Sequence, residues 1–204
     1  MPNRYSDLFI LYNHVVVEIY FPLVRNFVDE VHQKAGKAQG LRHFDRTVYW
    51  LKQLKPEADE ALLIAAYAHD IERAYRDSTY NKIDKSEKGF QDKGHLIYHQ
   101  ETGAKIMSDF LIGIEAPVEL IARVAMLISK HEIGGNPDQN LLKDADSVSF
   151  LETQVDHFVT EQVAVRGKEK VKEKFDWMYN RITSPNAEEV AKPWYHLALS
   201  KLGY

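Results

Sequence analysis

The chain has 204 residues, of which 45% are hydrophobic and 27% charged, which predicts one compact domain with a sizeable core. The formal net charge of −4 argues against a general nucleic-acid-binding protein, which would usually carry a basic surface. Cysteine is absent, which excludes disulfides and thiolate ligands, so any metal ion must be held by nitrogen and oxygen atoms.

The first 40 residues are expected to form an N-terminal helical segment that packs on the core. Helical periodicity runs over residues 6–32, with a bend expected near Pro22. The most apolar run, residues 8–28, is interrupted by polar and charged side chains and matches neither a secretory signal nor a membrane span. These features and the lack of cysteine favour a cytoplasmic protein that does not associate with a membrane.

Residues 41–163 are expected to form the core of the domain. Phe44, Val48 and Leu51 place one apolar stripe on a helix that Pro56 ends. The next helix is rich in alanine and directs His69 toward the interior. Residues 77–94 are the most polar stretch and predict a long mobile connection, either a lid over a site or a solvated loop.

Beyond this connection the pattern remains helical, and strand signals are weak throughout. A helix opened by Pro117 carries an apolar stripe that continues to His131, so this histidine is expected to face inward. The other helices are expected at residues 96–111, 141–163, 168–181 and 187–202. The predicted fold is therefore all-α: a helical bundle with a C-terminal helical extension, residues 164–204.

His69 and Asp70 lie side by side near the end of the apolar segment ALLIAAYAHDIERA. A single histidine on an apolar face is usually an ordinary core residue. A buried carboxylate beside it is costly unless it is paired or bound to a metal ion. The two residues together therefore indicate a shared partner, and a divalent cation is one that fits both.

The order of the histidines and aspartates resembles the HD superfamily of metal-dependent phosphohydrolases, which is named for a His-Asp pair on a helix. His43, in LRHFDRTVYWL, matches the family's preceding histidine, and Asp146, in LLKDADSVSF, matches its later aspartate. The resemblance covers about residues 41–150. It implies an HD-domain helical bundle in which His43, His69, Asp70 and Asp146 bind one metal ion.

Two further histidines resemble the HD subfamilies that bind two metals. His99 opens HQETGAKI, which is similar to their HPxxGAxI segment, and His131 stands where they place another ligand. The resemblance implies that Asp70 bridges to a second ion held by His99 and His131. These ligands suit iron, manganese, zinc or cobalt, and the two-metal subfamilies favour iron first and manganese second. One metal or two is left open.

A phosphate-bearing substrate also needs cations close to the metal. Arg73 follows Asp70 by one helical turn, in HDIER, where relatives reading HDIGK have a lysine; an arginine can grip a phosphate through two parallel hydrogen bonds. We expect Asp70 and Arg73 to act in catalysis, and Arg73, His95 and Lys130 to contact substrate. Arg76 is a weaker candidate, and the alternative for each of these side chains is a solvated surface residue.

The chain also departs from some HD relatives. Lys130 stands where the HD-GYP phosphodiesterases have the first of two adjacent histidines, and residues 134–137 read GGNP near the place of GYP. A third metal and cleavage of cyclic di-GMP are therefore not expected. The compact HD diadenosine tetraphosphate hydrolases have a more similar layout, but no motif fixes that substrate.

The resemblance implies an enzyme, a metal-dependent phosphohydrolase or phosphodiesterase that hydrolyses a nucleotide or small phosphate ester through a metal-bound hydroxide. Two alternatives stay open: a mixed-valent di-iron oxygenase with the same ligands, and a non-catalytic metal-binding signalling module. The expected partner is a small phosphate-containing molecule, with no nucleic acid and no membrane. C-terminal aromatic residues such as Trp177 and Trp194 are expected to pack in a core, and a homodimer is left open.

Overall fold

A computed structural model describes residues 18–76 and 91–204 of the chain. The described residues form helices and turns without a strand, so the prediction of an all-α fold is confirmed. The larger helices are α1 (Phe21–Lys34), α2 (Leu41–Leu54), α3 (Glu60–Ala68), α4 (Lys93–Gly113), α5 (Val118–Ile128), α6 (Pro137–Thr153), α9 (Lys168–Asn180) and α10 (Pro185–Leu202). The short elements are η1 (Ala38–Gly40), η2 (Ile71–Tyr75), α7 (Val155–His157), η5 (Phe158–Gln162) and α8 (Val163–Arg166).

Several helix ends differ from the predicted ones. Helix α1 begins at Phe21 and contains Pro22 in its first turn, where a missing N–H costs nothing, so the expected bend is absent. Residues 6–17 of the predicted helix lie outside the described residues, as do residues 77–90 of the predicted mobile connection. Helix α4 already begins at Lys93, because the side chain of Asp92 accepts a hydrogen bond from the His95 N–H and caps it.

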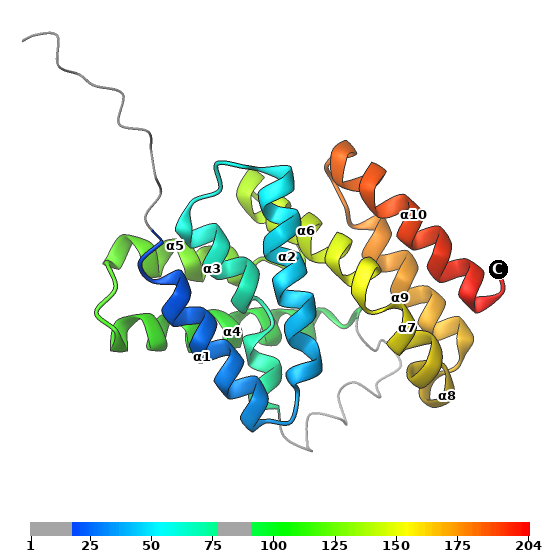
Figure 1. The fold of residues 1–204 in the computed structure, drawn as a ribbon, viewed down its shortest axis with the longest axis horizontal. Coiled ribbons are helices and arrows are strands. Elements are labelled where there is room, and N and C mark those ends of the chain that lie inside the picture. The colour runs from blue at the N-terminus through cyan, green and yellow to red at the C-terminus, as the bar shows by residue number, and fades with distance from the viewer. Residues whose placement is uncertain (1–17, 77–90) are drawn as a thin grey trace, which may run out of the picture.

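Helix α3 lies at the centre of the first core, between α1, α2 and α5 (Figure 1). Every residue from Ala61 to Ala68 is buried, which is the pattern of a helix surrounded by protein on all sides. Asp59 caps its first turn by accepting a hydrogen bond from the Leu62 N–H. The end of α3 therefore delivers the residues that follow it, His69 and Asp70, into the interior of the molecule.

Helix α6 is the second central helix and has a core on each side. It packs on α2 and also on α9 and α10, which lie at the opposite side of α6 from α1 and α3 (Figure 1). Asp144 ties these parts together, because its buried carboxylate accepts hydrogen bonds from the N–H groups of Thr183 and Ser184. The predicted helix over residues 141–163 is wrong in extent: α6 begins at Pro137, behind an Asn136 cap, and ends at Thr153.

The C-terminal helices pack against this second core as expected. Tyr179 and Tyr195 stack in parallel, with ring centroids 4.3 Å apart, and join α9 to α10. Trp177 and Trp194 are half-buried against the same cluster of apolar side chains. The division into segments 1–40, 41–163 and 164–204 stays a prediction.

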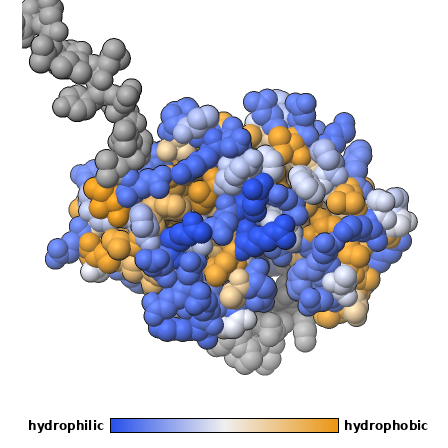
Figure 2. All heavy atoms as spheres, in the orientation of Figure 1, coloured by the Kyte–Doolittle hydropathy of each residue, from blue (hydrophilic) through white to orange (hydrophobic). Residues whose placement is uncertain are grey.

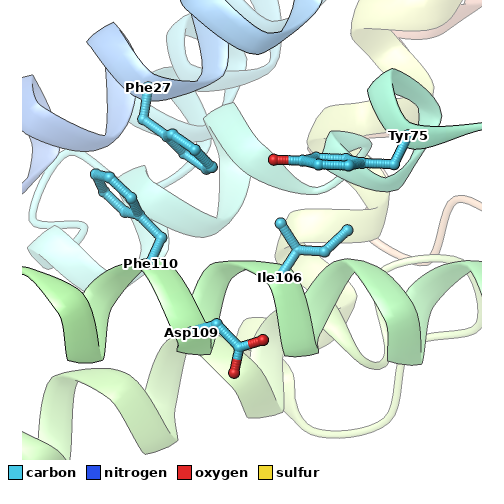
Figure 3. Close-up of a pocket in the computed structure, with 5 residues that line it drawn as sticks. All are labelled: Phe27, Tyr75, Ile106, Asp109 and Phe110. Carbon is cyan, nitrogen blue, oxygen red and sulfur yellow. The ribbon is translucent and has the colours of Figure 1, made fainter.

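The surface that faces the viewer in Figure 2 is mostly hydrophilic, with smaller hydrophobic patches between the polar side chains. A shallow groove of about 270 Å³ lies between α1 and α4. There Phe27 stacks on Phe110 with ring centroids 4.0 Å apart, Tyr75 and Ile106 lie beside them, and Asp109 points away (Figure 3). Within the described residues, no helix combines the length and the apolar character needed to cross a membrane.

Candidate metal centre

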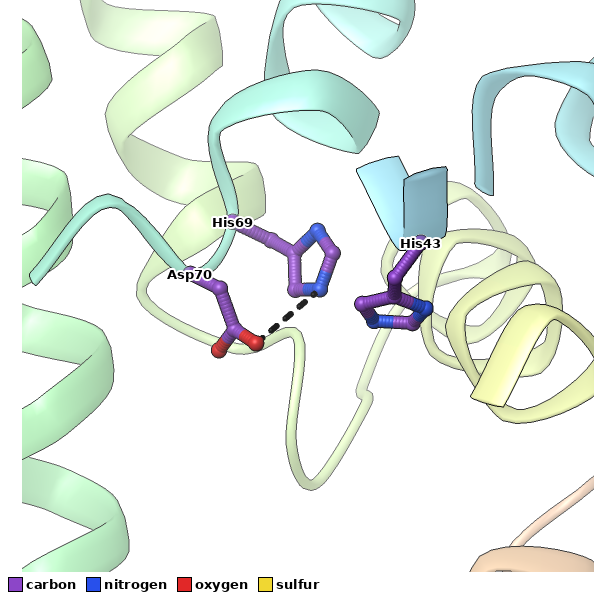
Figure 4. Close-up of side chains that lie close together, drawn as sticks. All are labelled: His43, His69 and Asp70. Atoms are coloured by element: carbon purple, nitrogen blue, oxygen red, sulfur yellow. Dashed lines mark ion pairs between the residues drawn. The ribbon is translucent and has the colours of Figure 1, made fainter. Parts of the chain in front are cut away.

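His69 and Asp70 occupy the turn that follows α3. His69 is 1% exposed and Asp70 6% exposed, because the buried helix ends one residue earlier. The Nδ1 of His69 donates to the carbonyl oxygen of Ala66 at 2.9 Å, which turns its Nε2 toward Asp70, 3.7 Å from Oδ2. In Figure 4 the rings of His43 and His69 lie side by side and nearly perpendicular to each other, and the Asp70 carboxylate points into the same space.

His43 and Asp146 reach this space from α2 and α6. The packing of these two helices places Asp146 Oδ1 3.0 Å from His43 Nε2 and 3.4 Å from His69 Nε2. His43 Nδ1 donates to the Ser149 hydroxyl oxygen at 2.8 Å, and that hydroxyl donates back to the His43 carbonyl at 2.7 Å. Ser149 therefore fixes the orientation of the His43 ring.

His99 approaches Asp70 from the other side, on α4. Helix α4 packs closely here: a Cβ at Gly103 would lie in van der Waals contact with the His69 carbonyl oxygen, 3.4 Å away. His99 Nε2 lies 2.9 Å from Asp70 Oδ1, and His99 Nδ1 donates to Glu72 at 2.7 Å. A histidine that donates to a carboxylate through Nδ1 is held in one orientation and is more basic at Nε2.

His131 completes the group, but from a turn rather than from a helix. The apolar stripe predicted it on α5, whereas α5 ends at Ile128 and His131 lies in the turn beyond it. It is nevertheless fully buried, as expected from the stripe. Its Nδ1 donates to the Ile128 carbonyl at 2.8 Å, and its Nε2 lies 4.0 Å from Asp70 Oδ1.

The four histidines share one arrangement that fits a metal ion. Each donates through Nδ1 and turns Nε2 toward the carboxylates, which is the orientation of metal-binding histidines in proteins. The Nε2 atoms of His69 and His131 are buried and have no hydrogen-bond partner among the described residues. A buried polar atom without a partner costs about 1–3 kcal/mol, and coordination of a cation would remove this cost.

Two groups of donor atoms are close enough to hold an ion. His43, His69 and Asp70 form one group and Asp70, His99 and His131 the other, with the atoms of each group within 4.8 Å of one another. Asp70 belongs to both groups, and its two carboxylate oxygens face different histidines. Imidazole and carboxylate donors suit transition metals such as iron, manganese, zinc or cobalt.

Burial and neighbouring charges change the pKa values of the side chains in the cluster. Burial by itself raises the pKa of Asp70, but Arg73, His69 and His99 outweigh it and hold that pKa well below its usual value. Burial also lowers the pKa of His69, yet Asp146 and Asp70 raise it to about 9. Burial dominates at His131 and lowers its pKa to about 4, so its Nε2 carries a lone pair at neutral pH.

Besides Glu72, two charged residues of the cluster, Arg181 and Glu132, were not among the predicted site residues. Arg181, at the end of α9, is 7% exposed on its side chain and donates to Asp146, to Glu132 and to Ser147. Arg181 lowers the pKa of Asp146 well below its usual value, against the effect of burial. Neither residue is marked by a local pattern: Glu132 is a single carboxylate next to His131, and Arg181 is distant along the chain.

The cluster lies at the floor of a cleft of about 1590 Å³ between the core helices and the C-terminal helices. The cationic side chains that line it outnumber the acidic ones outside the cluster: Lys37, Arg42, Arg73, Arg76, Arg166, Lys170, Lys174 and Arg181, against Asp156, Glu161 and Glu173. One wall contains η5, a π-helical turn, and such turns often occur at functional sites. The cleft can therefore admit an extended anionic molecule to the metal cluster.

Most of the residues predicted to contact substrate line the cleft, but one of them does not. Arg73 lines the cleft, is 44% exposed on its side chain, and donates through Nε to Asp70 Oδ2 at 2.7 Å. His95 and Arg76 also line the cleft. Lys130 does not: it is exposed in the turn after α5, and the structure does not bring it to the site. Glu72 pairs with Arg76 and His99.

Comparison with solved structures supports the fold prediction. The chain resembles the crystal structure of a predicted HD superfamily hydrolase from an uncultured Thermotogales bacterium, with a TM-score of 0.54 and 18% sequence identity. The similarity covers 89% of this chain and 88% of the other, so the chain has an HD-domain helical fold. No curated protein matches the sequence. Residues 26–197 match the family described as Domain of unknown function (DUF4202), and the chain therefore belongs to that family.

Proposed function

We propose that the protein is a metal-dependent phosphohydrolase or phosphodiesterase acting on a nucleotide or another small phosphate ester. One observation carries the proposal: the buried histidine and aspartate cluster opens into a cleft with many cationic side chains. A phosphate ester needs both features, because its charge must be neutralised while a water attacks phosphorus. A fold similarity by itself would not support a particular reaction.

The metal ligands we propose are His43, His69, Asp70 and Asp146 for one ion and Asp70, His99 and His131 for the other. Metal ions held there would lower the pKa of a water and offset negative charge on phosphate oxygens. The protein's own part is to hold the ligands in place: Ser149 fixes His43, Glu72 fixes His99, and backbone carbonyls fix His69 and His131. Iron is the metal we favour, with manganese second.

Arg73 is the residue we assign to the phosphate. Its Nε is occupied by Asp70, so the guanidinium is anchored directly beside the shared ligand, while the side chain stays partly open to the cleft. The other N–H groups can then donate to phosphate oxygens in a fixed direction. Arg42 is a second anion-binding candidate, because it is exposed in the cleft beside His43 and forms no ion pair with the described residues.

The test is an activity screen of protein reconstituted with iron or manganese. Phosphate release would be measured from nucleoside mono-, di- and triphosphates, nucleotide products from dinucleoside polyphosphates, and nitrophenol release from bis(p-nitrophenyl) phosphate, with oxygen consumption followed in parallel. We expect hydrolysis of at least one class of ester, and its loss in Asp70→Ala. A fully active Asp70→Ala protein would refute the proposal. Oxygen consumption without ester hydrolysis would favour the oxygenase alternative instead.

A further inference from the structure

Glu132 is buried beside the second group of donor atoms, and its two carboxylate oxygens have different surroundings. Its side chain is 7% exposed. Oε2 accepts a hydrogen bond from Arg181. Oε1 faces the histidines, 3.7 Å from His131 Nε2 and 3.8 Å from His99 Nε2. These separations are those of ion pairs rather than of hydrogen bonds, so Oε1 is held near the two Nε2 atoms by charge alone.

Asp146 has the same arrangement in the first group. Its Oδ2 accepts a hydrogen bond from Arg181, and its Oδ1 lies 3.0 and 3.4 Å from the Nε2 atoms of His43 and His69. Arg181 thus holds the outer oxygen of one carboxylate in each half of the cluster. In each half, the inner oxygen faces two histidine Nε2 atoms, and Asp70 lies between the halves.

We propose that Glu132 is a metal ligand, which completes a second site made of His99, His131, Asp70 and Glu132. The inference rests on the proposed metal centre and adds to it a residue that none of the sequence patterns indicated. Each ion would then have two imidazoles, one carboxylate of its own and a share of Asp70. Arg181 would position both carboxylates without touching either ion.

Distances and charge both favour this assignment. Metal–ligand bonds of about 2.0–2.2 Å put neighbouring ligand atoms about 3–3.5 Å apart, so small movements bring Oε1 and the two Nε2 atoms to one ion. Without Glu132, the second site would offer two imidazoles and only the shared carboxylate for a dication. Its position is also fixed, since the Glu132 N–H donates to the side chain of Gln100, next to His99 on α4.

The assignment can be tested by metal binding, without any substrate. Chelator-stripped wild type and Glu132→Gln would be titrated with Co²⁺, following visible absorption and counting bound metal by elemental mass spectrometry. Glutamine keeps the length of the side chain and can still accept a hydrogen bond from Arg181. Glu152→Gln is the matched control, because Glu152 pairs with Arg46 and Trp50 away from the cluster. Circular dichroism would verify that each variant folds.

We expect the wild type and Glu152→Gln to bind two ions. Glu132→Gln should keep one ion at wild-type affinity and bind the other more than about 100-fold more weakly, since even residues that only orient ligands are worth about 10–100-fold. Asp146→Asn should instead weaken the binding of the ion held by His43 and His69. If Glu132→Gln does not fold, Glu132→Asp can replace it in the test. This variant retains the charge, but its shorter side chain moves the carboxylate away from the ion. It should therefore also weaken the binding of one ion selectively.

Two ions bound to Glu132→Gln at wild-type affinity would overturn the inference and leave Glu132 as a partner of Arg181 only. A wild type that binds a single ion would overturn it as well, while leaving a mononuclear centre. A wild type that binds none would refute the metal centre itself, which separates failure of the proposed function from failure of this assignment.

Discussion

Arg181 and Asp146 form a buried ion pair between the end of α9 and the middle of α6. Asp146 faces two histidines with its other oxygen, so the pair connects the C-terminal helices directly to the candidate metal centre. The C-terminal segment therefore does more than extend the bundle. It supplies one wall of the cleft and the cation that balances two buried carboxylates.

Replacing Arg181 should destabilise the protein most strongly when no metal is bound. Arg181→Met leaves Asp146 and Glu132 buried without their cation, and loss of one partner of a buried pair costs about 3–5 kcal/mol. Urea denaturation of chelator-treated protein would measure this change, which added metal should reduce. Lys105→Met, which breaks an exposed pair with Asp109, should stay within about 0.5 kcal/mol. Equal effects of the two changes would contradict the role of Arg181.

The stability of the metal-free protein should depend on pH through His69. Its pKa is raised to about 9 in the folded protein, against 6.5 for an unperturbed histidine, so protonated His69 stabilises the fold. This contribution is fully present below pH 6.5 and is lost as pH rises through 9. The difference in unfolding free energy between wild type and His69→Gln, both metal-free, should therefore shrink by about 3 kcal/mol from pH 6.5 to 9.5. A constant difference would show that His69 is not protonated in the fold.

The stabilisation that metal provides should increase with pH, opposite to the effect of His69 in the metal-free protein, because coordination requires the neutral imidazole. Stabilisation by added metal, measured as the rise in Tm over the chelator-treated protein, should grow between pH 6.5 and 8.5. The physical reason is that less free energy is spent on removing the His69 proton as pH approaches 9. A rise in Tm that decreases with pH would argue that metal binds elsewhere.

Substrate binding should weaken above pH 8 because of Lys174. Burial lowers the pKa of this cleft lysine to about 8, so its charge is lost in a range where most lysines keep theirs. KM for the phosphate ester should rise by up to about tenfold per pH unit above that value, while kcat changes less. In Lys174→Arg the charge persists, and the rise in KM should move beyond pH 10. An unchanged profile in Lys174→Arg would remove Lys174 from substrate binding.

Arg73 should contribute to the reaction as well as to the charge balance of Asp70. Arg73→Ala removes a donor beside the shared ligand Asp70, and kcat/KM for ester hydrolysis should fall by about 10²–10³-fold. Arg73→Lys should recover part of the loss, because lysine keeps the charge but not the paired donors. Lys130→Ala is the matched control, since it removes an exposed cation outside the cleft. Comparable losses in Arg73→Ala and Lys130→Ala would contradict this assignment.

The sequence predicted the features that depend on local pattern. Helical periodicity gave the helices around the centre, and the buried α3 brought His69 and Asp70 inward as its apolar stripe indicated. Errors occurred at helix ends, where one side chain decides the outcome: Pro22 starts a helix rather than bending one, and Asn136 starts α6 earlier than expected.

The roles of Glu132 and Arg181 could not be derived from local pattern. Both are ordinary charged residues in the sequence, and they acquire a role only when α9 packs against α6. The structure does not bring Lys130 to the cleft, for a related reason. It precedes the buried His131, but the turn after α5 directs the two side chains differently, and Lys130 is exposed outside the cleft.

Metal content of purified protein, measured by elemental mass spectrometry after reconstitution, tests the central claim most directly. Wild type should bind about two ions per chain, His99→Ala about one, and Asp70→Ala none tightly, because Asp70 belongs to both groups of donor atoms. A wild type without bound metal, or an Asp70→Ala variant that retains the full amount, would contradict the assignment of this cluster as a metal centre.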